Sequence, residues 1–493
     1  MSNDPNGNRL PIKLDSTSNG EFVPRPLSPL HRQANQLAHT WAAHNARRCG
    51  LDRRRFLVSA CGAATTLLAF NHAYASRGES GGWFELPEEA ALEPELAAAH
   101  LGGKEFIFDI QGHFVNPQGR WINSVPEGRR PFAWAPKSQC ALPPQQQQQP
   151  RSYLQCLGQE AFIKDVFMDS DTDMMVLSFV PSHRDREPLT IEEADACRRL
   201  IDRLEGSQRL LLHGRVNPNQ DGDLQSMDEL AGRWRVSAWK TYTQWGPKRR
   251  GYFLYEEETG QKLIEKAREL GVKVICIHKG IPFGRRSYEH SRCDDIGVVA
   301  RQYPDVAFIV YHSGFDPALP EGPFAPSKGR DGVDSLVQSL LDNGISPNSN
   351  VYAELGSTWR FLMRDPTSAA HTLGKLLKFV GEDNLLWGTD SIWYGSPQDQ
   401  IQAFRSFQIH ERLREAHGYP KITPELRAKV FGLNATRPYK MQPEEVRQFL
   451  ARDRISTEKE DYRHRPDPSF LTYGPRTRRE FLNLLRWRGI NAG

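Results

Sequence analysis

The sequence predicts an α/β fold, a (β/α)8 TIM-like barrel with an N-terminal signal and linker region and a C-terminal helical extension. Two observations support this fold. Eight short apolar runs alternate with stretches of helical periodicity, which is typical of parallel strands joined by crossover helices. Several runs end in a polar, metal-capable side chain, as residues 106–113 and 308–312 do. Such ends are expected to meet at one mouth of a barrel.

The predicted strands are short and almost continuously apolar, as strands buried on both faces are. They are residues 105–110, 174–180, 209–216, 236–241, 272–278, 306–312, 351–354 and 385–389. Helical patterns fall between and after them, at residues 159–167, 190–205, 222–234, 258–270, 291–303, 331–343, 367–380 and 397–407. Gly271 and Gly344 stand where helices are expected to end, because glycine adopts the left-handed conformation of a C-terminal cap without strain.

The N-terminal region precedes the predicted barrel. Residues 1–51 are polar and aperiodic, so we expect them to be mostly disordered. Residues 52–75 show the order of a signal peptide: a charged region, a short apolar run and a small-x-small cleavage site near Ala75. The adjacent arginines followed by Phe56-Leu57 resemble the twin-arginine type. We therefore expect a periplasmic or extracellular protein without a stable membrane anchor; the alternative is a basic tail with a helix.

The rest of the chain divides into a linker, the barrel and a helical extension, at residues 76–104, 105–440 and 441–493. The extension contains one apolar helical segment, residues 481–487. Within the first strand-to-helix connection, Gln145–Gln149 form a low-complexity insert. Cys140 and Cys156 flank that insert and are either a disulfide or two reduced thiols.

The charge distribution argues against a nucleic-acid partner. The formal net charge is +4, from 64 basic and 60 acidic residues. Residues 1–75 hold nine of the basic and four of the acidic residues, so the remainder carries 55 and 56. A domain that binds nucleic acid would present a basic face, which this balance does not provide.

Polar side chains with metal-binding or proton-transferring chemistry follow the predicted strands. They are Gln111 and His113 after the first strand, Arg215 at the third, Lys240 at the fourth, His278 at the fifth, His312 at the sixth, Glu354 at the seventh and Asp390 at the eighth. In a parallel barrel these ends form the active-site face. Imidazole and carboxylate together suit Zn²⁺ or a similar divalent ion, which lowers the pKa of bound water to about 7.

Each of these residues also has a structural interpretation. A single His278 or His312 is more often a hydrogen-bonded structural histidine than a ligand, and Asp390 alone could cap the following helix. Lys240 is either a substrate contact or a salt-bridge partner. Arg215 and Trp393 either contact substrate or only pack the rim. The convergence of ligand types on separate strand ends favours the metal site.

The motifs resemble those of a known family. They are Asp109-x-Gln111-x-His113, His278, His312-Ser313-Gly314, Gly388-Thr389-Asp390 and Asn434-Ala435-x-Arg437. This set, spread over roughly residues 105–440, is similar to the amidohydrolase superfamily, and most to the amidohydrolase-related branch that includes aminocarboxymuconate-semialdehyde decarboxylase.

The resemblance implies roles for the strand-end residues. His113, His278 and Asp390 would be metal ligands, His312 would polarise the substrate or act as an acid–base, and Asp390 would also take the proton from the attacking water. Gln111 occupies the position of the family's first histidine. Its amide oxygen is a fourth candidate ligand, although it is poorer for Zn²⁺ than imidazole.

The predicted function is an exported metal-dependent hydrolase of a small lactone, amide or ester, using metal-bound hydroxide. The cofactor is one divalent ion, Zn²⁺ before Mn²⁺ or Fe²⁺. The expected partners are a small-molecule substrate and the twin-arginine export machinery, and a homo-oligomer is left open. Two alternatives remain: a metal-dependent decarboxylase, which is a lyase, and a non-catalytic binding barrel whose metal site has decayed through Gln111.

Overall fold

The computed structural model describes Asp4 and residues 6–121, 156–205, 209–247, 250–282, 287–328, 331–451 and 453–487. Gln145–Gln149 and Cys140 lie outside these residues. Cys156 is in a disulfide, whereas Cys49, Cys61, Cys197, Cys276 and Cys293 are free thiols.

Eight parallel strands form one sheet in sequence order, which confirms the predicted barrel. They are β2 (Phe108–Gly112), β3 (Met174–Leu177), β4 (Leu210–Arg215), β5 (Ala238–Tyr242), β6 (Val274–His278), β7 (Ala307–Tyr311), β8 (Val351–Glu354) and β9 (Leu385–Leu386). The chain after β9 closes the barrel against β2. The amide of Ile110 donates to the carbonyl of Trp387 at 3.1 Å, and the amide of Asp390 donates to the carbonyl of Gln111 at 2.9 Å.

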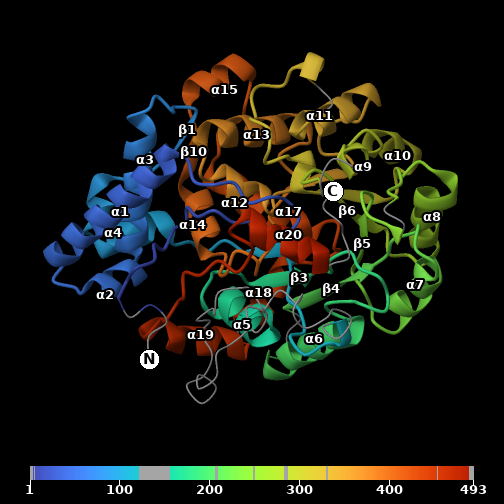
Figure 1. Cartoon of the computed structure of the whole chain (residues 1–493), viewed down its shortest axis with the longest axis horizontal. Helices are drawn as coiled ribbons and strands as arrows, with labels where there is room; N and C mark the ends of the chain where they lie inside the picture. Colours follow the sequence, from blue (N-terminus) through green and yellow to red (C-terminus); the bar gives the residue numbers. More distant parts are fainter. Residues whose placement is uncertain are drawn as a thin grey trace.

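Helices surround the strands at the predicted places (Figure 1). They are α5 (Gln159–Ile163) with η7 (Lys164–Met168), α6 (Ile191–Glu205), α7 (Asp223–Gly232), η9 (Glu257–Gln261) with α8 (Lys262–Glu269), α10 (Ile296–Gln302), α11 (Val333–Asp342), α13 (Pro366–Phe379) and α14 (Gln398–Ser406). Gly271 and Gly344 follow α8 and α11 with φ of +74° and +66°, so both predicted C-terminal glycines are confirmed.

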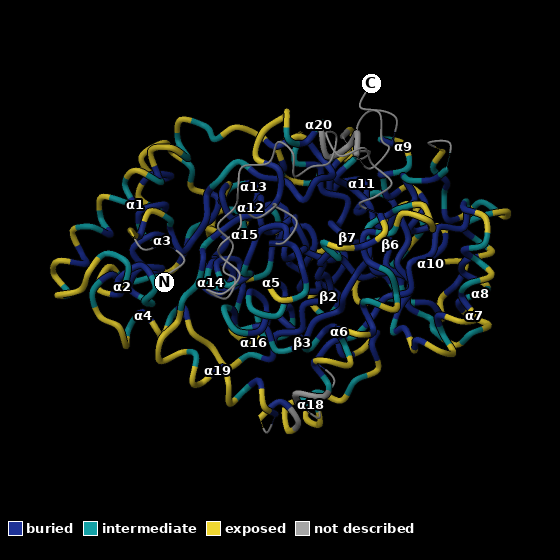
Figure 2. Tube along the Cα trace, turned by 60° about the horizontal axis from the view of Figure 1, so that its bottom comes forward, coloured by how far each residue is buried: buried dark blue, intermediate teal, exposed yellow. Residues whose placement is uncertain are grey.

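Strand side chains alternate between two apolar clusters, so the barrel is a packed core with the strands buried on both faces (Figure 2). Phe108, Ile110, Val176, Ile309 and Leu386 belong to the inner cluster. Their neighbours along the strands pack outward against the helices. This arrangement leaves only the strand ends for polar chemistry.

The N-terminal region is folded, so the expected disorder of residues 1–51 is wrong where the structure describes them. Helix α1 (Pro29–Arg48) begins with a capping box at Ser28. It packs with α2 (Arg53–Val58) and α3 (Ala60–Ala75) beside the barrel, at the blue end of the chain in Figure 1. Small residues on α1 and α3, among them Ala38 and Ala69, are fully buried and bring these two helices close together. A polar sequence can therefore fold when its alanines bury a common seam.

The region predicted as a signal peptide forms α2 and α3. Cleavage near Ala75 and export stay predictions, because a folded precursor does not test them. Among the described residues, none of the helices combines the length and the low polarity that a bilayer-crossing helix needs.

The predicted linker, residues 76–104, contains β1 (Gly82–Phe84), η1 (Glu88–Ala91) and α4 (Pro94–Leu101). Strand β1 pairs antiparallel with β10 (Phe407–Ile409), which follows α14. The linker therefore attaches the N-terminal helices to the last helix of the barrel.

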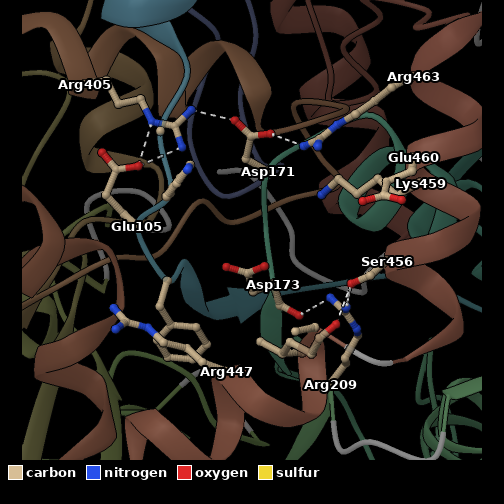
Figure 3. Close-up of a pocket in the computed structure, with 15 residues that line it drawn as sticks. Glu105, Asp171, Asp173, Arg209, Arg405, Arg447, Ser456, Lys459, Glu460 and Arg463 are labelled. Atoms are coloured by element: carbon tan, nitrogen blue, oxygen red, sulfur yellow. Dashed lines mark hydrogen bonds and ion pairs between the residues drawn. The ribbon is translucent and has the colours of Figure 1, made fainter.

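The C-terminal extension reaches both ends of the barrel: Asp453 pairs with Arg209 at the amino-terminal ends of the strands, whereas the amide of Tyr473 donates to the carbonyl of Trp393 at the mouth. After α15 (Glu411–His417), α16 (Pro424–Ala428), η13 (Lys429–Leu433) and α17 (Asn434–Thr436), the extension forms α18 (Pro443–Leu450), α19 (Arg454–His464) and α20 (Arg478–Trp487). A pocket of about 290 Å³ lies beside α19, at the amino-terminal ends of the first strands (Figure 3). Ion pairs line it, including Arg405 with Glu105 and Arg463 with Asp171. We interpret it as the seam between barrel and extension.

Candidate metal site

The end of β2 is held against the chain after β9 by a buried carboxyl group. Oδ1 of Asp109 accepts hydrogen bonds from the amides of Gln111 and Thr389 at 3.0 and 3.1 Å. Burial raises the pKa of Asp109 to about 7. Asp109 therefore fixes the backbone on both sides of the site, and Gln111 and His113 project from the strand end that it holds.

Asp390 is the centre of the hydrogen-bonded part of the site. Its Oδ1 lies 3.1 Å from Nε2 of His113 and accepts a 3.1 Å hydrogen bond from Nε2 of Gln111. Its Oδ2 accepts hydrogen bonds from Ser357 at 2.5 Å and from Asn19 at 2.8 Å. Burial alone would raise the pKa of Asp390, but the hydrogen bond and charge of His113 outweigh it and hold this pKa below its usual range. Asp390 is thus a carboxylate at neutral pH.

His312 presents a nitrogen lone pair to the site. Its Nδ1 lies 2.6 Å from the carbonyl oxygen of Gly356, to which only a protonated nitrogen can donate. Nε2 is therefore the unprotonated atom of the neutral ring, and it is buried without a hydrogen-bond partner in the described part of the chain. Burial lowers the pKa of His312 to about 4, which keeps the ring neutral at pH 7.

The His113 ring is also held through its Nδ1. Its Nδ1 lies 3.1 Å from the carbonyl oxygen of Ser178, so Nε2 faces Asp390. Its ring stacks on Trp393, with centroids 5.6 Å apart. Trp393 therefore positions a candidate ligand, a role that the sequence prediction of substrate contact does not include.

His278 lies beside His312, with ring centroids 4.4 Å apart, and stacks on Tyr242 at 4.9 Å. Burial lowers the pKa of His278 well below its usual value. One carboxylate oxygen of Glu21 lies 3.7 Å from Nδ1 of His278. Glu21, His278 and His312 are all buried, and each offers a ligand atom within 4.8 Å of the other two.

Glu21 and Asn19 are site residues that the sequence prediction missed. Both lie in the segment expected to be disordered, and polar residues in a polar stretch carry no sign of burial. The one available signal is the alternation of Leu10, Ile12 and Leu14, which is typical of an extended segment with one buried face.

The remaining predicted residues occupy different surroundings. Lys240 is fully buried, and its Nζ lies 3.4 Å from the centre of the Tyr311 ring without a hydrogen-bond partner among the described residues. Burial lowers the pKa of Lys240 to about 8. Arg215 is instead bound by Glu187 at 2.7 Å and Asp223 at 3.0 Å, so its guanidinium group is engaged by the protein itself.

The backbone of the site adopts a conformation that is unusual for residues with side chains. His312, Ser313, Ser357 and Asp390 have φ between +53° and +63°. Such residues cost free energy and persist where the surrounding structure holds them, which is common at active sites. Here they turn the chain sharply after β7, β8 and β9 and direct the side chains inward.

The donor set fits a divalent metal ion. Imidazole nitrogens and carboxylate oxygens are the ligands that Zn²⁺ and related ions take. Nε2 of His312 and Oε1 of Gln111 are buried acceptor atoms without a hydrogen-bond partner in the described part of the chain. An ion would satisfy such atoms, because a buried polar group without a partner is costly.

One comparison with known proteins, a family model, covers much of the barrel. The family model described as Amidohydrolase matches residues 216–441, just under half of the chain, which include His278, His312 and Asp390. No curated protein matches in sequence.

Three solved structures illustrate the likeness. The 2,6-dihydroxybenzoate decarboxylase from Rhizobium is 16% identical and covers 68% of this chain and 99% of its own, with a TM-score of 0.38. A manganese-bound 5-carboxyvanillate decarboxylase from Novosphingobium aromaticivorans is 15% identical and covers 68% of this chain and 97% of its own, with a TM-score of 0.41. An uncharacterized TIM-barrel protein from Bordetella bronchiseptica is 12% identical and covers 70% of this chain and 99% of its own, with a TM-score of 0.42. At these identities and TM-scores, they carry no argument about activity.

The family model described as Amidohydrolase therefore matches the part of the barrel that carries His278, His312 and Asp390, and this is the family to which residues 216–441 are similar.

Proposed function

We propose that this protein is a metal-dependent hydrolase of a small carbonyl-bearing molecule. The observation that carries the proposal is the convergence of His113, His278, His312 and Asp390 at the carboxyl ends of the barrel strands, all of them buried. When bound there, a divalent ion would supply Lewis acidity and lower the pKa of water. The function resides in this site, since the barrel scaffold alone hosts many chemistries.

The protein's own groups would handle protons and orientation. Asp390 stays ionised and accepts hydrogen bonds, so it is suited to receive a proton from an attacking water. Nε2 of His312 is the one lone pair of the neutral ring, so it can serve either of two roles: it can hold the ion, or it can accept a proton and return it to a leaving group. The carbonyl of Gly356 holds the His312 ring in this tautomer.

Lys240 points to an anionic substrate. The ammonium group of Lys240 is buried under aromatic rings, and the charges of Glu354, Glu21 and Asp390 offset only part of the cost, since burial still lowers its pKa to about 8. A substrate carboxylate would offset the rest of the cost. The same observation favours a second candidate, a metal-dependent decarboxylase, because a lyase of that kind requires a carboxylate-bearing substrate.

The test combines metal analysis with product analysis. We expect about one divalent ion per chain in protein purified without chelators, and its loss in His278→Ala. The matched control is His44→Ala on α1, remote from the site. Lactones, amides, esters and aromatic carboxylates are then assayed for hydrolysis and for CO₂ release. Hydrolysis products support the hydrolase, and CO₂ supports the lyase. A wild-type protein that takes up no ion would contradict both.

A further inference from the structure

The N-terminal strap, which we define as residues 10–22, crosses the mouth of the barrel. Its anchors are deeply buried. Nζ of Lys13 donates to the carbonyl oxygens of Tyr394 and Ser396 at 2.8 and 3.0 Å. The amide of Ser18 donates at 3.1 Å to the carbonyl of Pro475, in the C-terminal extension. The strap is thus held by hydrogen bonds to the barrel and to the C-terminal extension.

A tight turn in the strap aims Glu21 at the site. The amide of Glu21 donates to Oδ1 of Asn19 at 3.0 Å, and the amide of Gly20 donates to Oγ of Ser18 at 2.9 Å. Gly20 has a φ of +88°, which a residue with a side chain rarely adopts. The Asn19 amide also donates to Oε2 of Glu21 at 2.5 Å. The carboxylate is therefore fixed in one orientation, with Oε1 facing His278.

The spacing of Glu21 and His278 matches that of two ligands around one ion. Their 3.7 Å separation is longer than a hydrogen bond. Two ligand atoms at about 2.1 Å from a tetrahedral ion lie about 3.4 Å apart. A carboxylate and two imidazoles, here Glu21, His278 and His312, are also a donor set that catalytic zinc sites use.

The charge of the site supports the same conclusion. The side-chain amide of Asn19 donates hydrogen bonds to both Glu21 and Asp390, so the two buried carboxyl groups lie close together. Two negative charges removed from water repel each other at low dielectric constant. The ammonium group of Lys240 offsets part of this charge, and a divalent cation beside the two carboxylates would neutralise the rest.

We propose that Glu21 of the N-terminal strap is a ligand of the metal ion, together with His278 and His312. The proposal rests on the metal-dependent function argued above and assigns a ligand from outside the barrel. It also requires that the metal-loaded protein keep its N-terminal region. Cleavage near Ala75 would remove the strap and Glu21 with it.

The experiment uses the full chain, stripped of metal and titrated with Co²⁺, whose visible absorption reports the ligands directly. We compare the wild type with Glu21→Gln, Glu21→Asp and His278→Ala. Glu88→Gln is the matched control, because Glu88 is an exposed carboxylate remote from the site. Thermal unfolding of each metal-free variant shows whether it is folded, and Glu21→Asp keeps the charge if Glu21→Gln does not fold.

We expect Glu21→Gln to weaken Co²⁺ binding by about 10-fold or more and to change the absorption bands. Glu21→Asp should shift the bands with a smaller loss of affinity, and Glu88→Gln should match the wild type. The intact mass of the loaded protein should include residues 1–75.

Three results would overturn the proposal. If Glu21→Gln binds Co²⁺ with the wild-type Kd and spectrum while His278→Ala does not bind it, Glu21 is not a ligand and the proposed function stands. If the loaded protein begins after Glu21, the same conclusion follows. If the wild type binds no Co²⁺, the proposed function fails as well.

Discussion

The side-chain amide of Asn19 donates a 2.8 Å hydrogen bond to Oδ2 of Asp390, a residue 371 positions later in the chain. This bond joins the N-terminal strap to the end of the eighth barrel strand. Both side chains are buried, so the bond is shielded from water. The folding of the N-terminal region and the geometry of the candidate metal site are therefore coupled through one amide group.

Asn19→Ala should destabilise the metal-free protein. The change removes a donor shared by Glu21 and Asp390 and leaves two buried carboxylates with fewer hydrogen bonds. We expect the free energy of unfolding to fall by about 1–3 kcal/mol, measured by urea denaturation. Asn6→Ala, at an exposed position, is the control and should change it by less than about 0.5 kcal/mol. Equal stability of the two variants would show that the strap is not docked at Asp390.

The barrel was predictable because its signals are local. Each strand is a short apolar run followed by a helical pattern, and Gly271 and Gly344 mark helix ends by a property of glycine alone. The strand-end residues His113, His278, His312 and Asp390 do converge, since parallel topology brings strand ends together.

The strap and the role of Glu21 were not predictable in the same way. The apolar pattern in residues 10–22 is too short and too polar to predict burial. The segment is buried by contacts with the carboxyl end of β6 and the chain after β9, which lie far away in the sequence. Residues 29–75 fold by packing alanines of α1 and α3, and alanine carries little hydrophobic signal. The engagement of Arg215 by Glu187 likewise depends on a loop position that the sequence does not specify.

Lys240→Met should stabilise the metal-free protein at pH 7 and weaken binding of anionic substrates. Burial lowers the pKa of Lys240 from 10.5 to about 8, so the charged form is disfavoured in the folded state. This cost is fully present below about pH 8 and is relieved as the pH rises towards 10.5. We expect a gain of about 2 kcal/mol in the free energy of unfolding at pH 7.

The gain from Lys240→Met should vanish above about pH 10, which urea denaturation at several pH values would show. The exposed Lys421→Met is the control and should show neither effect. A loss of stability in Lys240→Met would mean that the ammonium group is neutralised within the folded protein.

Asp165→Asn should also stabilise the protein at neutral pH. Asp165 lies in η7, and its Oδ2 has no hydrogen-bond partner among the described residues. Burial, with a further contribution from Asp169, raises the pKa of Asp165 to about 6. The folded state therefore keeps a proton that the unfolded state has lost between about pH 4 and 6, and stability falls as the pH rises through this range.

The difference in unfolding free energy between Asp165→Asn and the wild type separates the pH-dependent contribution of Asp165 from the contributions of other carboxyl groups. It should be small at pH 4 and grow to about 2 kcal/mol in favour of the variant at pH 7. The exposed Asp221→Asn serves as the control, with no change of this kind. A difference that does not depend on pH would show that Asp165 is not protonated in the folded state.

Arg405→Met should be strongly destabilising, because Arg405 forms ion pairs with both Glu105 and Asp171 near the amino-terminal ends of β2 and β3 (Figure 3). Its guanidinium group, only 2% exposed, lies 3.0 Å from Glu105 and 2.5 Å from Asp171. Although burial would raise the pKa of Asp171, the charge of Arg405 lowers it to about 2. Removing the arginine leaves two partly buried carboxylates without their main cation, and we expect a loss of about 3–5 kcal/mol.

Arg463→Met is the matched control, because Arg463 contacts the same Asp171 at 3.1 Å but is 60% exposed. It should cost less than about 1 kcal/mol, since exposed ion pairs contribute little. The contribution of the Arg405 pair is present above about pH 4 and is lost as the pH falls towards 2, so the two variants should differ less in acid. Similar losses in both variants at pH 7 would mean that burial does not distinguish the two ion pairs of Asp171.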